Sequence, residues 1–231
     1  MGGFANNAPI VTDGLVFYVD AGNSKSYPGS GTTWSDLVGS NDGTLANGPT
    51  YSSNNGGSIV FDGTNDLVTT TLTSNTTFNS TFTISCWFNA DTVSGFPRPF
   101  SKSNNGSTTD VGGFSIFFND SSGTYQIYCR INGNLINTSS ATFSLGTWNN
   151  LTAVFKNGEV TVYLNQSSGV TGTNASALLS GITTTDDFII GNLHAADRPF
   201  DGNIATTMIY NRELSSTEIT QNYNALKNRF V

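Results

Sequence analysis

Apolar and polar side chains alternate over most of the chain, which is typical of strands that bury one face and expose the other. In residues 14–20, Leu15, Phe17 and Val19 fall on the same face. The same period recurs in residues 81–90, 112–120, 124–132, 148–156, 159–166, 187–192 and 202–211. The pattern predicts about a dozen short strands, more than a single sheet commonly holds.

Turn signals separate these apolar segments. Asn157-Gly158 lies between residues 148–156 and 159–166 and supplies the positive φ angles of a tight hairpin turn. Asn-Gly, Ser-Gly and Asp-Gly pairs occur at 132–133, 122–123, 62–63 and 201–202. Since no helical pattern intervenes, we expect an all-β fold, a sandwich of antiparallel strands.

Only the C-terminal segment changes period. Ser215 and Glu218 form a capping-box pattern, which marks the start of a helix. Ile219, Tyr223, Leu226 and Phe230 follow at helical spacing. We therefore expect a short C-terminal helix that packs on the sandwich and covers a sheet edge or an end of the core.

The composition agrees with a single β domain. The chain has 231 residues, and only 11% of them are charged, compared with about 25% in typical soluble domains. Thr favours strands, and Gly and Asn accept the backbone angles of tight turns. We expect one domain over residues 14–231, preceded by an N-terminal arm at 1–13 that docks on an assembly.

Charge and hydropathy exclude two classes of partner. The formal net charge is −7 and the pI is about 4.4, so a polyanion such as nucleic acid would be repelled. No apolar run approaches the roughly 20 residues of a membrane helix, and we expect no membrane insertion. The first residues lack the basic and hydrophobic regions of a signal peptide, which predicts synthesis in a cytoplasm.

The two cysteines carry little functional information. Cys86 and Cys129 are each in phase with apolar neighbours, which predicts buried free thiols. A cross-strand disulfide is the alternative. The single histidine, His194, is far from both in sequence, so no zinc-type spacing exists.

Five segments occur in an order that resembles the concanavalin A-like lectin/glucanase superfamily, and its laminin-G-like branch in particular. They read "GLVFYVDAGN" (14–23), "SIVFDGTNDLV" (58–68), "FTISCWF" (82–88), "WNNLTAVFKNGEVTVYLN" (148–165) and "FDGNIATTMIYNRELSSTEITQNYNALKNR" (200–229). The resemblance implies a jelly-roll sandwich of two antiparallel sheets, with binding residues in the loops at one rim.

The opening "PIVTDGLVFYVDAGNSKSYPGSGTTWSDLVG" (9–39) is similar to versions of this domain encoded by tailed bacteriophages and other viruses. That likeness implies a virion protein, either a capsid decoration protein or an accessory fibre or adhesin. Its partners would be the major capsid protein or other virion proteins and host surface glycans, and a homo-oligomer is compatible with this role. The alternative is a calcium-dependent carbohydrate-binding module of a cell-surface or secreted system.

The hydrolases of this superfamily use paired carboxylates on one strand, and that motif is absent here. Glu159 follows a hairpin turn, Glu213 precedes the expected helix and Glu218 fits the capping box. His194 and Asp197 lack a serine in a nucleophile-elbow context. We therefore expect no enzymatic activity.

Two loops contain residue types suited to a sugar, whose apolar faces stack on rings and whose hydroxyls bond to planar polar groups. The candidate ligand-binding residues are Phe96, Arg98 and Asn104 in the first loop and His194, Asp197 and Arg198 in the second. Arg-Pro-Phe occurs in both, at 98–100 and 198–200. We expect Phe100 and Phe200 to begin their strands inside the core, and Phe96, Arg98 and Arg198 to be exposed.

The resemblance permits calcium as a cofactor. Its site would be formed by separated loops that include Asp62, Asp66 and Asp201. Calcium takes six to eight oxygen ligands, and Asp62 and Asp66 do not follow the EF-hand spacing. Asp-Gly is also ordinary tight-turn chemistry. On that alternative, the two Phe-Asp-Gly motifs are sheet corners that place a phenylalanine in the core.

Overall fold

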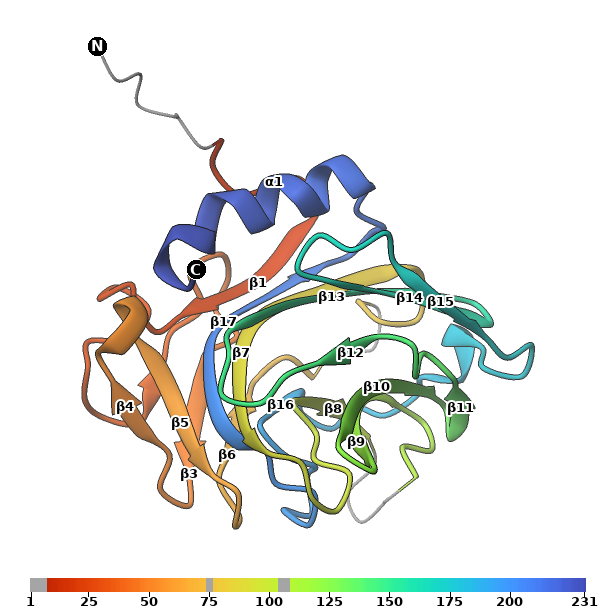
Figure 1. The fold of residues 1–231 in the computed structure, drawn as a ribbon, viewed down its shortest axis with the longest axis horizontal. Helices are drawn as coiled ribbons and strands as arrows, with labels where there is room; N and C mark the ends of the chain where they lie inside the picture. Colours follow the sequence, from red (N-terminus) through yellow and green to blue (C-terminus); the bar gives the residue numbers. More distant parts are fainter. Residues whose placement is uncertain (1–7, 74–76, 104–108) are drawn as a thin grey trace.

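A computed structural model describes residues 8–73, 77–103 and 109–231. These residues fold into two stacked antiparallel sheets with one α-helix near the C-terminus (Figure 1). The expected all-β jelly-roll sandwich is confirmed. Within the described ranges, no helix is long and apolar enough to cross a membrane.

The first sheet has eight strands among the described residues. They are β1 (Leu15–Asp20), β4 (Thr50–Ser52), β5 (Ser58–Asp62), β7 (Phe82–Thr92), β13 (Asn149–Lys156), β14 (Glu159–Leu164), β15 (Val170–Thr173) and β17 (Asp201–Tyr210). Their order is β15-β14-β13-β7-β17-β5-β4, and β1 also pairs with β17.

The second sheet has nine strands in the same part of the chain. They are β2 (Thr33–Trp34), β3 (Gly43–Ala46), β6 (Leu67–Thr70), β8 (Phe100–Lys102), β9 (Phe114–Ser121), β10 (Thr124–Ile131), β11 (Asn134–Ile136), β12 (Thr142–Phe143) and β16 (Ile189–Ile190). Their order is β11-β10-β9-β8-β16-β6-β3-β2, and β12 pairs with β10.

The helix α1 (Ser216–Leu226) begins at the expected capping box and continues into a 3₁₀ turn, η3 (Lys227–Arg229). Two more 3₁₀ turns, η1 (Asn54–Gly56) and η2 (Leu179–Gly181), lie in loops between strands.

Phenylalanine rings from both sheets fill the space between them. Phe82 of β7 stacks on Phe155 of β13 at 4.5 Å between ring centroids, and both contact Phe114 of the opposite sheet. Phe100 and Phe200 are also fully buried, as expected for the first core residues of their strands. Each such ring removes a large apolar area from water, and together the rings contribute much of the stability of the sandwich.

Both cysteines are buried free thiols, as the sequence analysis predicts. Cys86 lies in β7 of the first sheet and Cys129 in β10 of the second. Burial raises the pKa of the Cys129 thiol to about 12, so the reactive thiolate is rare at neutral pH.

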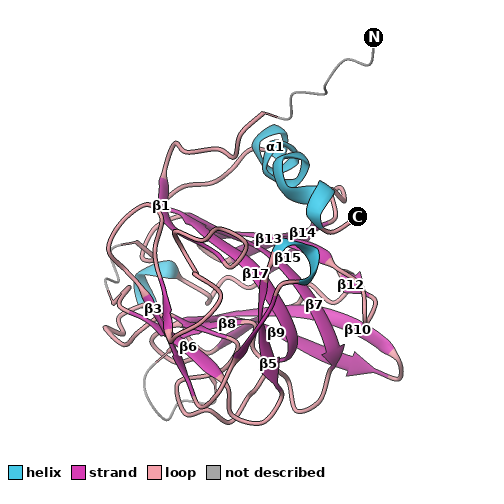
Figure 2. Ribbon diagram, turned by 90° about the vertical axis from the view of Figure 1, so that its left-hand side faces the viewer, coloured by secondary structure: helices cyan, strands magenta, loops and turns pink. Residues whose placement is uncertain are grey.

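Helix α1 covers the outer face of the first sheet, whereas we expected it at an edge or an end (Figure 2). Trp87, which points outward from β7, stacks on Tyr223 at 5.3 Å and on Phe230 at 4.4 Å. The apolar stripe of the helix therefore meets an apolar sheet face, and the outer face of the second sheet lies on the opposite side of the molecule.

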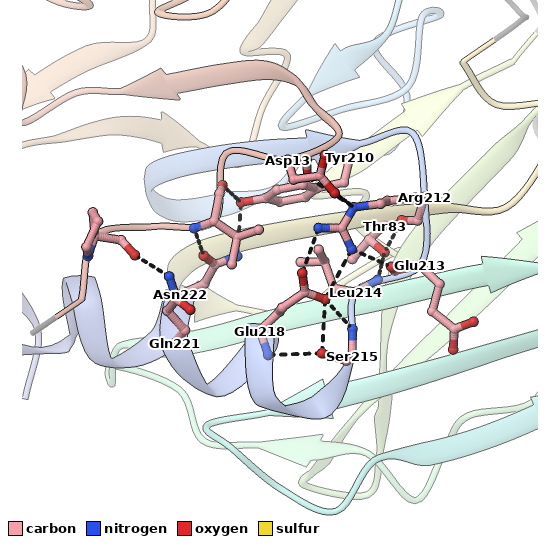
Figure 3. A network of polar contacts seen from close by, with 12 residues as sticks. Asp13, Thr83, Tyr210, Arg212, Glu213, Leu214, Ser215, Glu218, Gln221 and Asn222 are labelled. Atoms are coloured by element: carbon pink, nitrogen blue, oxygen red, sulfur yellow. Dashed lines mark hydrogen bonds and ion pairs between the residues drawn. The ribbon is translucent and has the colours of Figure 1, made fainter.

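The described part of the expected arm is bound to the domain itself. Val11 donates its backbone N–H to Asn222 Oδ1 at 2.8 Å, and Tyr210 donates its hydroxyl to the Val11 carbonyl at 3.0 Å (Figure 3). Gln221 donates to the Pro9 carbonyl at 2.7 Å. Residues 1–7 lie outside the described part, and docking of the arm on an assembly stays a prediction.

Glu218 joins the start of α1 to the end of β17 (Figure 3). Its carboxylate accepts hydrogen bonds from Arg212 Nη2 at 2.6 Å and from the Ser215 backbone N–H at 2.8 Å. The bond from Arg212, followed by the backbone bond from Ser215, lowers the pKa of Glu218 to about 2. The folded state therefore favours the charged carboxylate.

We expect Glu218→Gln to destabilise the protein by about 1 kcal/mol at pH 7, because the capping and ionic contacts both weaken. The pKa of Glu218 falls from 4.5 to about 2 on folding, so its contribution is present above pH 4.5 and lost as the pH falls toward 2. Urea denaturation should show the difference from the parent protein at pH 7 and little difference near pH 2. Glu213→Gln, at a more exposed carboxylate, is the control; an equal loss at both pH values would contradict the assignment.

Candidate ligand-binding site

Aromatic and polar side chains line the outer face of the second sheet on β9 and β10. Alternation places Phe114, Ile116 and Phe118 in the core, so Phe117 points to the other face. Phe117 lies directly opposite Tyr128 in the register of β9 and β10. This face therefore carries aromatic side chains that the core does not use.

Two adjoining hollows open over these strands. The arginine hollow, about 230 Å³ in volume, is lined by Phe96, Arg98, Thr109, Phe117, Arg130 and Arg198. The tyrosine hollow, about 240 Å³, is lined by Phe96, Phe117, Asn119, Tyr128, Arg130 and Leu135. Each is smaller than the roughly 300 Å³ at which pockets for drug-sized molecules begin, and the two share three residues.

Three rings form the apolar surface of the hollows. Phe117 stacks on Tyr128 at 5.4 Å with an interplanar angle of 15°, and Phe96 meets Phe117 edge-on at 6.2 Å. Phe117 is buried, but Phe96 is 51% exposed. The φ angle of Phe96 is 62°, an uncommon value for a large side chain that the surrounding loop must hold.

The two Arg-Pro-Phe segments lie side by side. Arg98 donates its backbone N–H to the carbonyl of Arg198 at 3.0 Å. Arg198 in turn donates its backbone N–H to Asn192 Oδ1 at 3.0 Å. The structure thus brings together Phe96, Arg98 and Arg198, candidates separated by about a hundred residues, while Phe100 and Phe200 enter the core.

The expected exposure of Arg98 is wrong. Its side chain is 3% exposed and pairs with Asp110 Oδ2 at 3.1 Å, and the carboxyl of Asp110 is fully buried. Ser115 donates its hydroxyl to the same oxygen at 2.8 Å, and Arg98 Nη1 donates to the Phe96 carbonyl at 3.0 Å. Arg98 is drawn inward because a buried carboxylate needs a charged partner, and it anchors the loop that presents Phe96.

Sequence reasoning missed Phe117, Tyr128, Arg130, Asn119 and Leu135, which line the hollows. A signal for four of them was present, since Phe117, Asn119, Tyr128 and Arg130 occupy the outward phase of strands whose core phase is already apolar. Arg130 extends over the Phe117 ring, with 5.5 Å from its guanidinium carbon to the ring centroid.

Of the remaining candidates, the two that the structure describes fall outside the hollows. Asn104 lies outside the described residues. His194 and Asp197 belong to the same loop as Arg198 but do not line either hollow. Asp197 is exposed and lies 4.0 Å from Arg198, a separation that makes a weak surface ion pair.

The carboxylates proposed for calcium accept hydrogen bonds from groups of the protein. Asp62 and Asp201 are opposite each other on β5 and β17, and the rings of Phe61 and Phe200 beside them meet at 6.0 Å. Asp66 Oδ2 accepts the Asp62 backbone N–H at 3.0 Å. Both Phe-Asp-Gly motifs place a phenylalanine in the core, as the alternative interpretation holds. Only the first is a turn at the end of a strand, because Asp201 and Gly202 begin β17 and are paired there, at a register shift.

Calcium fits this corner poorly as it stands. Asp62 Oδ1 also accepts the Thr64 backbone N–H at 2.8 Å, and Asp201 Oδ2 accepts the Thr92 hydroxyl at 2.7 Å. In the described ranges, no group of three or more His, Cys, Asp or Glu side chains is placed to hold a metal ion. Calcium at Asp62, Asp66 and Asp201 stays a prediction.

A laminin-G-type family model, described as the concanavalin A-like lectin/glucanases superfamily, matches residues 62–220. The chain belongs to this superfamily. No curated protein matches it by sequence.

Several solved structures share the fold at low sequence identity. Domain 4 of AbnA, a GH43 extracellular arabinanase from Geobacillus stearothermophilus solved with arabinotriose, has a TM-score of 0.67 and 19% identity, over 90% of this chain and 97% of that one. Trypanosoma rangeli sialidase, solved with sialic acid, has a TM-score of 0.70 and 17% identity. The match covers 97% of this chain and 35% of the sialidase. The CBM40 domain of Ruminococcus gnavus IT-sialidase, bound to α2,3-sialyllactose, has a TM-score of 0.53 and 16% identity over 70% and 93% of the two chains.

We expect Asp110→Asn to cost about 3–5 kcal/mol of stability, because it leaves the buried Arg98 guanidinium without its counter-charge. Asp197→Asn removes a carboxylate from an exposed arginine pair and should cost less than about 1 kcal/mol. Thermal and urea unfolding of both variants would measure the difference. Equal, small losses would show that the Arg98–Asp110 pair does not hold the loop.

Proposed function

We propose that this protein is a glycan-binding module that holds a saccharide in the two adjoining hollows. The observation that carries the proposal is the exposed ring of Phe96 beside the Phe117–Tyr128 stack, with guanidinium and amide groups around them. The apolar face of a sugar packs on such rings, while hydroxyls bond to planar polar groups at the rim. Membership of the lectin/glucanase superfamily supports this function.

The site is prepared before a ligand arrives. The buried Arg98–Asp110 pair and the bond between the Arg98 and Arg198 backbones fix the segments that carry Phe96 and Arg198. Segments that are already fixed lose little entropy on binding, which favours affinity from a small contact area.

We propose that the module acts without catalysis. Hydrolysis of a glycosidic bond by the usual route needs two carboxyl groups beside the bond. Among the described residues that line the hollows, none is Asp or Glu. Glu218 and Glu213 instead pair with Arg212 and Lys156 at the helix side of the molecule.

Two of the structural neighbours were solved with ligands of the same class. The arabinanase domain was solved with arabinotriose and the CBM40 domain with sialyllactose. At identities below 20% these likenesses carry the fold alone, so the support for glycan binding comes from the hollows.

A glycan array followed by calorimetry on the best ligand would test the proposal. Phe96→Ala should weaken binding about tenfold or more by removing half-exposed aromatic surface. Leu178→Ala truncates another exposed apolar side chain that lines neither hollow, and it should leave affinity unchanged. We expect the same affinity with and without a chelator, and a loss on chelation would favour calcium at Asp62, Asp66 and Asp201.

Failure of every glycan on the array, or binding that is indifferent to Phe96→Ala, would overturn the proposed site.

A place on a virus particle, as a capsid decoration protein or accessory adhesin, is a second proposal. It rests on the likeness of residues 9–39 to virus-encoded domains. Glycan binding would suit it, since a particle-bound lectin meets host surface sugars. Mass spectrometry of purified particles should detect this chain at a stoichiometry close to that of a structural protein, and its absence would refute the virion role.

A further inference from the structure

Three guanidinium groups converge in an otherwise acidic protein. The chain carries a net charge of −7 and has five arginines. Three of them, Arg98, Arg130 and Arg198, line the arginine hollow, whose volume is about 230 Å³. Like charges so close together raise the free energy of the folded state unless opposite charge is supplied.

The protein supplies only part of that opposite charge. Asp110 neutralises Arg98 across a fully buried contact of 3.1 Å. The exposed carboxylate of Asp197 is 4.0 Å from Arg198, which is worth little in water. Within the part of the chain that the structure describes, Arg130 forms no salt bridge, and its buried Nε has no hydrogen-bond partner.

The three groups affect one another electrostatically. Burial lowers the pKa of Arg98, and the positive charges of Arg130 and Arg198 lower it further, while Asp110 opposes them. Arginine nevertheless stays protonated at neutral pH. The hollow is therefore a preformed positive site that is partly shielded from water. Its electrostatic potential would attract an anion.

We propose that the arginine hollow binds the carboxylate of an acidic sugar residue, of the uronic or sialic acid type, through Arg130 and Arg198. The planar guanidinium matches a carboxylate better than it matches a hydroxyl. The shared ring of Phe96 then contacts the sugar ring, and the tyrosine hollow receives the next residue of the saccharide. This inference rests on the proposed glycan-binding function and adds the class of sugar to it.

Calorimetry on matched ligand pairs would test the choice of sugar. One pair is trigalacturonate and its methyl ester, which differ in the charge of the carboxyl groups. The other is α2,3-sialyllactose and lactose. In at least one pair the acidic member should bind about tenfold or more tightly than its neutral partner, as expected for charge-assisted hydrogen bonds. The pair that responds identifies the source of the carboxylate.

Two variants assign the preference to the hollow. Arg130→Met and Arg198→Met should each weaken binding of the acidic member more than binding of the neutral member, so that the acidic-over-neutral preference falls about tenfold or more. Arg198 is partly exposed, so its variant tests the inference even if Arg130→Met fails to fold. Lys25→Met removes the same charge from an exposed position that lines neither hollow and should leave the preference intact.

The outcomes separate this inference from the function on which it rests. Equal binding of acidic and neutral members, a preference that survives both arginine variants, or a preference for sulfated over carboxylated sugars would overturn the carboxylate site while glycan binding stood. Absence of binding by every saccharide would overturn both.

Discussion

The packing of phenylalanine rings between the two sheets is the interaction on which the rest of this structure depends. Phe82, Phe114 and Phe155 meet across the sandwich, and each comes from a strand that alternates core and outward positions. Side chains alternate between the two faces of a strand, so the residues that point into the core also determine which residues point outward. The aromatic face of β9 and β10 is therefore a consequence of the core.

The two outer faces of the sandwich have different roles. Helix α1 and the residues after it cover the first sheet, where Tyr223 and Phe230 stack on Trp87 of β7, and the N-terminal segment is hydrogen-bonded to the helix. The second sheet keeps an open face on which the loops form two hollows. A rigid framework with loops held at one face is the usual arrangement for recognition, since the framework carries the stability and the loops the contacts.

Charged residues are distributed unevenly in the protein. The chain carries a net charge of −7, and three of its five arginines line one small hollow. Of these three arginines, Arg98 forms a buried ion pair with Asp110 and stabilises the loop, whereas Arg130 and Arg198 are partly accessible. The burial of Arg98 and the location of its partner decide which role each arginine takes.

Alternation, turn pairs and the capping box predicted the longer strands, the Asn157-Gly158 hairpin and the start of α1, because these are local patterns read over a few residues. The described residues form seventeen strands where the sequence predicted about a dozen, since the shortest strands are too short to show the alternation. The same reasoning predicted that Phe100 and Phe200 lie in the core and that Phe96 is exposed on its loop. Only the tertiary structure decided that Arg98 turns inward, that the two Arg-Pro-Phe segments touch and that Phe117, Tyr128 and Arg130 meet them. Those contacts join residues far apart in sequence, and their geometry depends on how the sheets and loops pack together.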